Sequence, residues 1–451
     1  MTNRTSNMPG TKYIPGYSER RTGRLIQRAN HPAGEPIWEH IRRPWWVRLI
    51  NAVGAGLRRF GVRWPRLDAG KLLTAARRQS GRSDFGDGRF REGLGVLVDA
   101  FNARDDAPAF ARIVFSDHVV SLLVNRLKIQ ADLTRHPEIL DVPLARPLFI
   151  TGLPRSGTTF LHRLMSEDPA GRTLRTWEGW MPSPPPTYET YRTDPRIALR
   201  RRQDDLANRL SPRLAMAHEV AAESPEEDIY LFARDFQSVM FETLFEVPEY
   251  TRWLRSRDLG PSYHYARRQL QLLSWKYRAD HWVLKAPAHL SWLEELLDAF
   301  PDASVIVTHR DPLQVVPSWC SLMAGLRRIV NERLDLHRLG AECAEELAWR
   351  SERMIAARTA LDPARFFDVS YERMVADPIS TIREACRHFG YDFSPEYEAR
   401  ARRYIAENPR HKHGVHRYRL EDFGLDEATV NHQFADYRHW LAGRGLVVAG
   451  C

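Results

Sequence analysis

The stretch "LFITGLPRSGTTFLHRLM", residues 148–165, is the most informative part of the chain. Gly152 and Gly157 have the spacing of the G-x-x-x-x-G-K-[ST] loop with which ATP- and GTP-binding proteins hold phosphate, and Thr159 takes the place of its Ser or Thr. Thr158, however, stands where that loop has the lysine that contacts the β- and γ-phosphates. A loop without this lysine has either lost its function or holds a different anion.

Three further β-prone runs resemble the start of this stretch, residues 148–151. They are "WVLK" (282–285), "SVIVT" (304–308) and "FFDVSY" (366–371), and each leads into a turn or a helical stretch. Strands that alternate with helices indicate a parallel sheet with right-handed crossovers, on which ligands bind beyond the carboxyl ends of the strands. The sequence therefore predicts an α/β fold with a P-loop-like parallel sheet flanked by helices.

The composition divides the chain into three predicted regions. Residues 1–43 form an irregular basic arm rich in Gly, Pro and Arg. Residues 44–140 have apolar residues at three- and four-residue spacing, which is typical of helices. We therefore expect a helical N-terminal region over 44–140, which covers or shapes a substrate site, and a domain built on the sheet over 141–451.

Cationic side chains follow the predicted strands. Arg155 lies inside the loop, Lys285 ends one strand, and Arg310 follows another. Because the carboxyl ends of parallel strands meet at one edge, we expect a site for a ligand with several negative groups and no metal ion. The chain has only six lysines among its 66 basic residues, so a lysine at 285 is the less expected choice. The alternative is that Lys285 merely extends its ammonium group to solvent.

These motifs together resemble those of the sulfotransferases that use 3′-phosphoadenosine 5′-phosphosulfate (PAPS). The resemblance rests on "GLPRSGTT" (152–159), on Arg310 followed eight residues later by Ser318, and on Tyr371 in "VSYERMVADP". It extends over most of the chain from about residue 65, and the helical extension is similar to that of large bacterial members.

The resemblance implies which residues bind the donor. Residues 155–159 would hold the 5′-phosphosulfate, Arg310 and Ser318 the 3′-phosphate, and Lys285 would lie beside the bridging oxygen where charge develops. A sulfuryl group carries less charge than a phosphoryl group, so protein cations can suffice without a metal. The residues implied in donor binding are Arg155, Ser156, Gly157, Thr158, Thr159, Arg310, Ser318, Tyr371, Lys412 and Gly414, the last two in the basic loop "NPRHKHGVHRYRLEDFGLD".

The catalytic base is expected to be a carboxylate or a histidine, because the acceptor hydroxyl must lose its proton. Glu178 lies between two tryptophans, 23 residues after Arg155, and is similar in position to the Glu of protein- and glycan-sulfating members. Cytosolic small-molecule members use a His two residues after the strand-end lysine. That position is Pro287 here, and His289 follows two residues later. We therefore prefer Glu178 and keep His289 as the alternative.

The net charge of +9 is concentrated at the N-terminus. Residues 1–67 carry 13 Lys and Arg against three Glu, and the remainder is nearly neutral, which argues against a nucleic-acid-binding face. The four cysteines lack C-x-x-C spacing, so we expect free thiols and no structural metal. With no signal-peptide pattern and no apolar run that could span a bilayer, the expected compartment is the cytoplasm.

Residues 44–64 permit two interpretations. Their apolar residues recur at helical spacing, and four arginines add charge. Such a helix could lie on an anionic membrane as a peripheral contact, or it could pack its apolar stripe on the main domain. We favour packing, because Gly54 and Gly56 interrupt the stripe. The residues of the stripe are Trp46, Leu49, Ile50, Val53, Leu57 and Phe60.

Two other functions compete with PAPS-dependent sulfotransfer. A P-loop kinase or NTPase would need a metal and the missing loop lysine. A non-catalytic nucleotide-binding scaffold would need neither Lys285 nor Glu178. The acceptor is expected to be the hydroxyl of a small molecule, a lipid or a carbohydrate, and the sequence predicts no particular oligomeric state.

Overall fold

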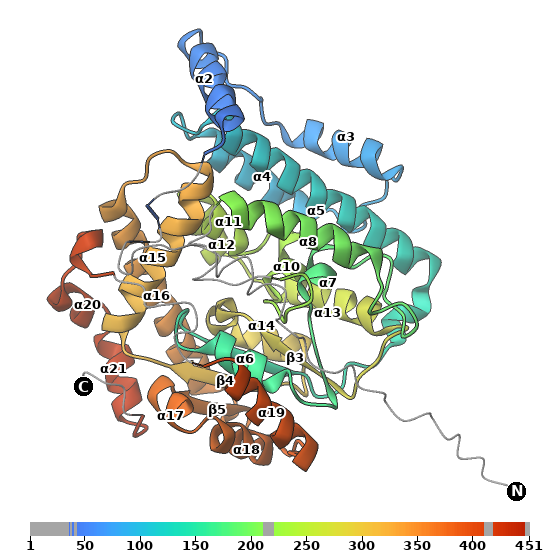
Figure 1. The fold of residues 1–451 in the computed structure, drawn as a ribbon, viewed down its shortest axis with the longest axis vertical. Coiled ribbons are helices and arrows are strands. Elements are labelled where there is room, and N and C mark those ends of the chain that lie inside the picture. The colour runs from blue at the N-terminus through green and yellow to red at the C-terminus, as the bar shows by residue number, and fades with distance from the viewer. Residues whose placement is uncertain (1–35, 37, 40–42, 211–220, 410–417, 447–451) are drawn as a thin grey trace, which may run out of the picture.

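The computed structural model of the chain describes residues 36, 38–39, 43–210, 221–409 and 418–446. A five-stranded parallel sheet in the order β2-β3-β1-β4-β5 lies at its centre (Figure 1). The predicted α/β fold is confirmed, and all four predicted runs are strands. β2 was not predicted, because its three residues carry no β-prone pattern. The strands are β1 (Leu148–Gly152), β2 (Gly171–Thr173), β3 (His281–Lys285), β4 (Ser304–His309) and β5 (Phe366–Ser370).

Successive residues of the central strands point to opposite faces of the sheet, and each face has its own hydrophobic core. Phe149 and Leu284 belong to the larger core, whereas Leu148, Ile150 and Val283 belong to the smaller one. Helices cover both faces, as a parallel sheet requires. The carboxyl ends of the strands are therefore where polar chemistry can be placed.

The helices fall into groups by their place in the chain. Those before the sheet are α2 (Trp45–Arg59), α3 (Ala69–Ser80), α4 (Phe90–Asn102), α5 (Ala109–Arg135) and η2 (Pro137–Asp141). Those between β1 and β3 are α6 (Thr158–Met165), α7 (Thr176–Trp180), α8 (Pro195–Leu210), α10 (Ile229–Ala233), α11 (Met240–Leu244), α12 (Pro248–Arg255) and α13 (Gly260–Ser274). Those between β3 and β5 are η3 (Pro287–Ser291), α14 (Leu293–Ala299), α15 (Pro312–Val330), α16 (Leu336–Ala360) and η4 (Pro363–Arg365). The last are α17 (Tyr371–Ala376), α18 (Pro378–Phe389), α19 (Pro395–Glu407), η5 (Glu421–Phe423), α20 (Glu427–Gln433) and α21 (Ala435–Ala442).

The smaller core is closed by α6, α18 and α19, while the larger core joins α3, α4 and α5 to the helices on the other face of the sheet. α5 is 27 residues long and has buried side chains on all sides, so it serves as the central support of the N-terminal helices. No helix within the described ranges has both the length and the apolar composition that crossing a bilayer needs.

α2 buries a different face from the one that we expected. Its buried residues are Val47, Asn51 and Gly54. A Cβ on Gly54 would lie 2.4 Å from the Cβ of Ala109, so glycine here permits close contact with α5. The expected packing of the apolar stripe is wrong, because the helix is held by the narrow face of Val47, Asn51 and Gly54, which leaves Leu49 and other apolar residues exposed.

Candidate active site

The predicted phosphate loop joins β1 to α6 at the carboxyl edge of the sheet. Gly152 has a φ of 146° and Gly157 a φ of 93°, conformations that favour glycine. A Cβ on Gly152 would lie 2.3 Å from the carbonyl oxygen of Thr308, and one on Gly157 would lie 2.3 Å from Cε of Met374. The loop is thus held between β4 and α17. Because α6 begins at Thr158, its free N–H groups can bind an anion at the loop.

Arg155, Arg310 and Ser318 lie together beside this loop. Nε of Arg155 donates to Oγ of Ser318 at 3.1 Å, and Nη1 of Arg310 donates to the carbonyl oxygen of Arg155 at 2.8 Å. Burial lowers the pKa of Arg155, and the nearby Arg310 adds to this effect. Two cations so close repel each other, so a bound polyanion would be favourable here.

Tyr371 completes the cationic side of the site. The guanidinium carbon of Arg310 lies 4.2 Å from the centre of the Tyr371 ring, and Nη2 of Arg310 donates to Oε1 of Gln314 at 2.9 Å. Nε of Arg310 is buried and has no hydrogen-bond partner among the described residues. A buried donor on a guanidinium fixed in this way would be satisfied by an anionic oxygen.

Lys285 ends β3 with its ammonium group close to the loop. Its Nζ donates to Oε1 of Glu227 at 2.6 Å and to Oγ1 of Thr159 at 3.5 Å. The Lys285 side chain is 2 % exposed and that of Glu227 is 19 % exposed. Lys285 therefore links the phosphate loop to a carboxylate that sequence analysis did not single out.

The backbone next to Glu227 is fixed by the strand end and by His289. The N–H of Asp228 donates to the carbonyl oxygen of Lys285 at 3.2 Å. The carboxylate of Asp228 accepts from Nε2 of His289 at 2.9 Å, and Nδ1 of His289 lies 2.8 Å from the hydroxyl of Tyr263. His289 is buried with both ring nitrogens in use. This geometry favours a positioning role for His289 over that of the base.

Glu178 is fully buried, with 0 % of its surface exposed. Its carboxylate pairs with Arg172, accepts from the backbone N–H of Arg175 at 3.2 Å, and accepts from the hydroxyl of Tyr191 at 2.9 Å. It is also absent from the residues that line the cavity beside the loop. The geometry therefore does not support the expected role of Glu178 as base, because its oxygens are occupied and no acceptor can reach them.

A cavity of about 320 Å³ opens beside the loop, a size within the range of small-molecule sites. Arg155, Thr158, Thr159 and Glu227 form its polar end. Because the loop and the Lys285–Glu227 pair meet here, a ligand in the cavity would contact both the anion site and a carboxylate.

The rest of the cavity is mainly apolar. α15 presents Trp319, Leu322, Leu326 and Ile329 to it, at three- and four-residue spacing that puts them on one face. This strip is roughly 15 Å long at the rise of an α-helix. α11 adds Met240, Thr243 and Leu244, and the charged exceptions include Arg200, Asp204 and Arg350. The cavity thus suits a molecule with one reactive polar group and a long apolar body.

Two features of the site were missed in the sequence. Glu227 belongs to the acidic run Glu226 to Asp228, but nothing in the sequence places this run beside Lys285. The apolar spacing on α15, directly after Arg310 and Ser318, was the available signal for the cavity wall. Lys412 and Gly414, expected in a closing loop, lie outside the described residues.

Comparisons with known proteins point to one family. The model of the "Sulfotransferase family" matches residues 147–395. Two curated relatives, from Mycobacterium bovis and Mycobacterium tuberculosis, are both named omega-hydroxy-beta-dihydromenaquinone-9 sulfotransferase Stf3. Each is 25% identical to this chain over 293 residues, which cover 61% of this chain and 70% of the relative.

Solved structures of mycobacterial proteins are similar over most of the chain. Sulfotransferase STF9 from Mycobacterium avium superposes with a TM-score of 0.79 and 31% identity, over 86% of this chain and 100% of that one. Sulfotransferase STF1 from Mycobacterium tuberculosis H37Rv gives a TM-score of 0.75 and 33% identity, over 83% of this chain and 100% of that one.

Proposed function

Because the chain belongs to the sulfotransferase family, we propose that it transfers a sulfuryl group from PAPS to the hydroxyl group of a lipid-like acceptor. The observation that carries this proposal is the cavity that joins the Lys285–Glu227 pair and the phosphate loop at one end to the apolar face of α15. This cavity brings together an anion site, a carboxylate and room for an apolar molecule.

The residues around the loop fit the donor. Arg155 and the N–H groups of residues 156–159 would hold the 5′-phosphosulfate, and Arg310 with Ser318 would hold the 3′-phosphate. The buried unpaired Nε of Arg310 supports this assignment, since it needs an acceptor. Gly157 lets the loop backbone pack closely against α17, because a Cβ here would lie 2.3 Å from Cε of Met374, and this contact fixes the loop beside the donor site. The donor supplies the activated sulfuryl group.

Glu227 is the proposed base. It accepts the proton of the acceptor hydroxyl as the oxygen attacks. Lys285, at 2.6 Å from the Glu227 carboxylate, stabilises the charge that develops on the leaving oxygen. Asp228 and His289 fix the backbone next to Glu227, and Glu178 neutralises Arg172 away from the cavity.

The acceptor is proposed to be a lipid alcohol. The Stf3 relatives are named for action on a hydroxylated dihydromenaquinone, and the apolar strip on α15 supports a similar class here. A carbohydrate would need many polar partners, which this strip lacks. A compact small molecule would leave much of the strip unfilled. Cys320, Cys343 and Cys386 are buried free thiols, which supports a reducing compartment such as the cytoplasm.

Nucleotide binding, measured by calorimetry, tests the donor assignment against the other function classes. Adenosine 3′,5′-bisphosphate should bind more tightly than adenosine 5′-phosphate, because Arg310 would contact the extra phosphate. Turnover of ATP with magnesium in place of PAPS would identify a kinase or NTPase. Tight binding of the bisphosphate without sulfation of any acceptor in a broad panel would identify a scaffold.

A further inference from the structure

Exposed large apolar side chains gather on one short segment. Among the described residues, seven of the ten exposed large hydrophobic side chains lie between residues 45 and 64. Phe60 is 85% exposed and Trp45 is 74% exposed. Single exposed apolar residues are ordinary, but such a concentration marks an interaction site. The seven residues are Trp45, Trp46, Leu49, Val53, Phe60, Val62 and Trp64.

This apolar surface faces outward because α2 is anchored elsewhere. Nη2 of Arg43 donates to the carbonyl oxygens of Arg328 and Asn331 at 2.9 and 2.6 Å. Asn51 donates to Glu332 at 2.7 Å and accepts from the N–H of Phe110 at 2.9 Å. The helix is thus fixed by these hydrogen bonds together with the buried Val47 and Gly54. It forms the end of the molecule opposite α18 (Figure 1).

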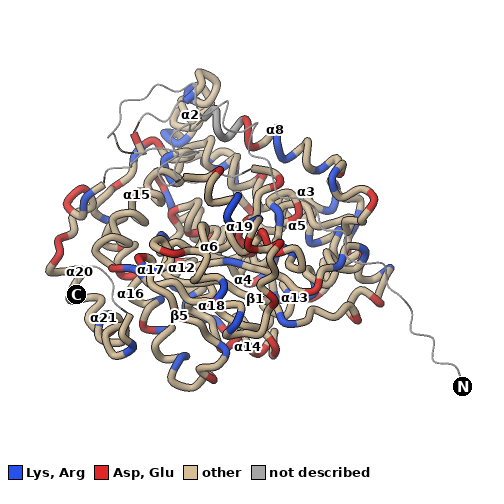
Figure 2. The backbone as a smooth tube through the Cα atoms, turned by 60° about the horizontal axis from the view of Figure 1, so that its bottom comes forward, with Lys and Arg blue, Asp and Glu red and all other residues tan. Residues whose placement is uncertain are grey.

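Positive charge surrounds the exposed apolar residues. Residues 43–64 contain five arginines and no Asp or Glu, and Figure 2 shows the basic positions on α2. Arg48 and Arg59 are exposed on the helix, and Arg63 follows in the turn after it. Tryptophan and arginine together are typical of segments that lie at a lipid–water interface.

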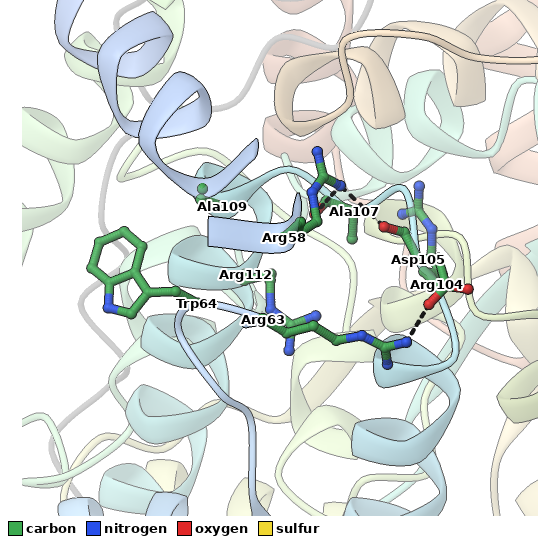
Figure 3. Close-up of a pocket in the computed structure, with 9 residues that line it drawn as sticks. Arg58, Arg63, Trp64, Arg104, Asp105, Ala107, Ala109 and Arg112 are labelled. Atoms are coloured by element: carbon green, nitrogen blue, oxygen red, sulfur yellow. Dashed lines mark hydrogen bonds and ion pairs between the residues drawn. The ribbon is translucent and has the colours of Figure 1, made fainter. Parts of the chain in front are cut away.

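A small pocket lined by arginines lies beside the end of α2 (Figure 3). Arg58, Arg63, Arg104 and Arg112 line it, against Asp105 as its acidic lining residue. Burial lowers the pKa of Arg112, and Arg63 and Arg58 lower it further, as expected where cations crowd together. Nη1 of Arg104 is buried without a hydrogen-bond partner among the described residues. With a volume of about 10 Å³ the pocket has room for about one water molecule, so it contributes positive charge beside α2 and does not enclose a whole phosphate group.

We propose that residues 43–64 dock on the surface of an anionic lipid bilayer, with the exposed aromatic side chains in the headgroup region and the arginines on lipid phosphates. Charge complementarity favours an anionic bilayer over a second copy of the chain as the partner of this surface. A second copy of the chain would place the exposed Arg48 and Arg59 against their own counterparts, which is unfavourable. A bilayer supplies both the negative charge and the apolar depth that this surface needs.

The docking surface adjoins the apolar end of the cavity. Ile329, the last α15 residue that lines the cavity, follows Arg328, whose carbonyl oxygen accepts from Arg43 at the start of the docking surface. A lipid acceptor would therefore enter the cavity from the bilayer side and extend its hydroxyl group toward Glu227. This step, unlike the docking itself, rests on the proposed function.

Vesicle flotation with the full-length protein tests the docking surface. The protein should float with vesicles of phosphatidylcholine and phosphatidylglycerol and not with phosphatidylcholine alone, and added salt should weaken binding. Replacing two exposed side chains, Trp45→Ala with Phe60→Ala, should lower the apparent affinity by tenfold or more. Leu140→Ala removes another exposed apolar side chain, outside this surface, and should leave flotation unchanged.

The docking proposal and the proposed function would be contradicted by different results. Absence of flotation with phosphatidylglycerol, or equal flotation of the double variant, would overturn the proposal. A concentration-dependent dimer that the double variant abolishes, without vesicle binding, would assign the surface to a second copy instead. The double variant should still bind adenosine 3′,5′-bisphosphate, so loss of docking is separable from loss of the donor site. A protein that floats but sulfates nothing would refute the proposed function and leave the docking surface standing.

Discussion

The two ends of the cavity are built on different principles. At the sheet edge, polar side chains on loops after separate strands are linked to one another, as in the bond from Arg310 to Arg155 and the pair of Lys285 with Glu227. Along α15, the wall is one helix face whose residues contribute shape and apolar area. The first end can hold only a ligand whose charges match fixed positions, whereas the second selects by size and apolarity. Substitutions at the two ends should therefore change different measured quantities.

The largest effect is expected from Glu227→Gln at the polar end. Loss of the base should lower turnover by about 10²–10⁴ with donor affinity nearly unchanged. The melting temperature should also fall, because the buried Lys285 loses its ionic partner. Steady-state sulfation rates at saturating PAPS measure this. The matched control is Glu223→Gln, which removes a nearby carboxylate that pairs with Arg201 and does not line the cavity. Full turnover in the Glu227 variant would break the assignment.

Glu178→Gln separates a structural carboxylate from a catalytic one. Arg172 would remain buried without its counter-ion, and breaking a buried pair costs about 3–5 kcal/mol of unfolding free energy. Urea denaturation should show this loss, while the folded variant keeps its donor affinity. A variant as stable as wild type but without turnover would restore Glu178 as the base.

Arg310→Ala should weaken adenosine 3′,5′-bisphosphate by about tenfold to a hundredfold, because a charge-assisted hydrogen bond contributes about 1.5–3 kcal/mol. Affinity for adenosine 5′-phosphate should change much less, so the preference between the two nucleotides should disappear in calorimetry. Arg252→Ala, at an exposed arginine remote from the loop, is the control. Equal loss for both nucleotides would show that Arg310 acts only on loop structure.

The apolar end is probed by Leu326→Ala on α15. Removal of this side chain should raise KM for a lipid acceptor by about tenfold, since a buried leucine contributes about 1.5–3 kcal/mol of transfer free energy. Donor affinity should stay as in wild type. If donor affinity and KM for the acceptor change together, the two ends are not independent.

A small effect of pH on the free energy of unfolding is expected from Glu242, which pairs with Arg350 in the cavity wall. Arg350 pairs with Glu242 at 3.3 Å and also with Glu346. Burial, with Glu346, raises the pKa of Glu242 to about 8, whereas an unfolded Glu titrates near about 4.3. The folded state binds this proton more tightly, so unfolding free energy falls as pH rises between these two values.

Glu242→Gln removes this pH-dependent loss. Between about pH 5 and about pH 8, its melting temperature should therefore fall by a few degrees less than that of wild type. Thermal denaturation at the two pH values measures the difference. A difference in melting temperature between variant and wild type that is the same at both pH values would contradict the raised pKa of Glu242.

The polar end was largely predictable from the sequence because its residues sit in local patterns. Glycines at fixed spacing, a strand before them and cations after other strands predicted the sheet and the loop. The structure brings Arg155, Arg310, Ser318 and Tyr371 to one place. These positions follow from strand order, which short β-prone runs reveal.

The remaining features depend on contacts that no local pattern encodes. Glu227 meets Lys285 across 58 residues of chain, and nothing near either residue predicts this pairing. Glu178 has the flanking tryptophans of a pocket residue, yet Arg172 and Tyr191 occupy it. On α2 the apolar stripe suggested packing, but Gly54 lets the opposite face approach Ala109 instead.

The most direct test of the account is transfer of label from sulfur-labelled PAPS to a lipid extract, with wild type and Glu227→Gln side by side. We predict a labelled apolar product with wild type, which the variant forms at least a hundredfold more slowly. Absence of a labelled lipid despite tight binding of adenosine 3′,5′-bisphosphate, or equal labelling by both proteins, would contradict the central claim that the donor end and the apolar end form one catalytic site.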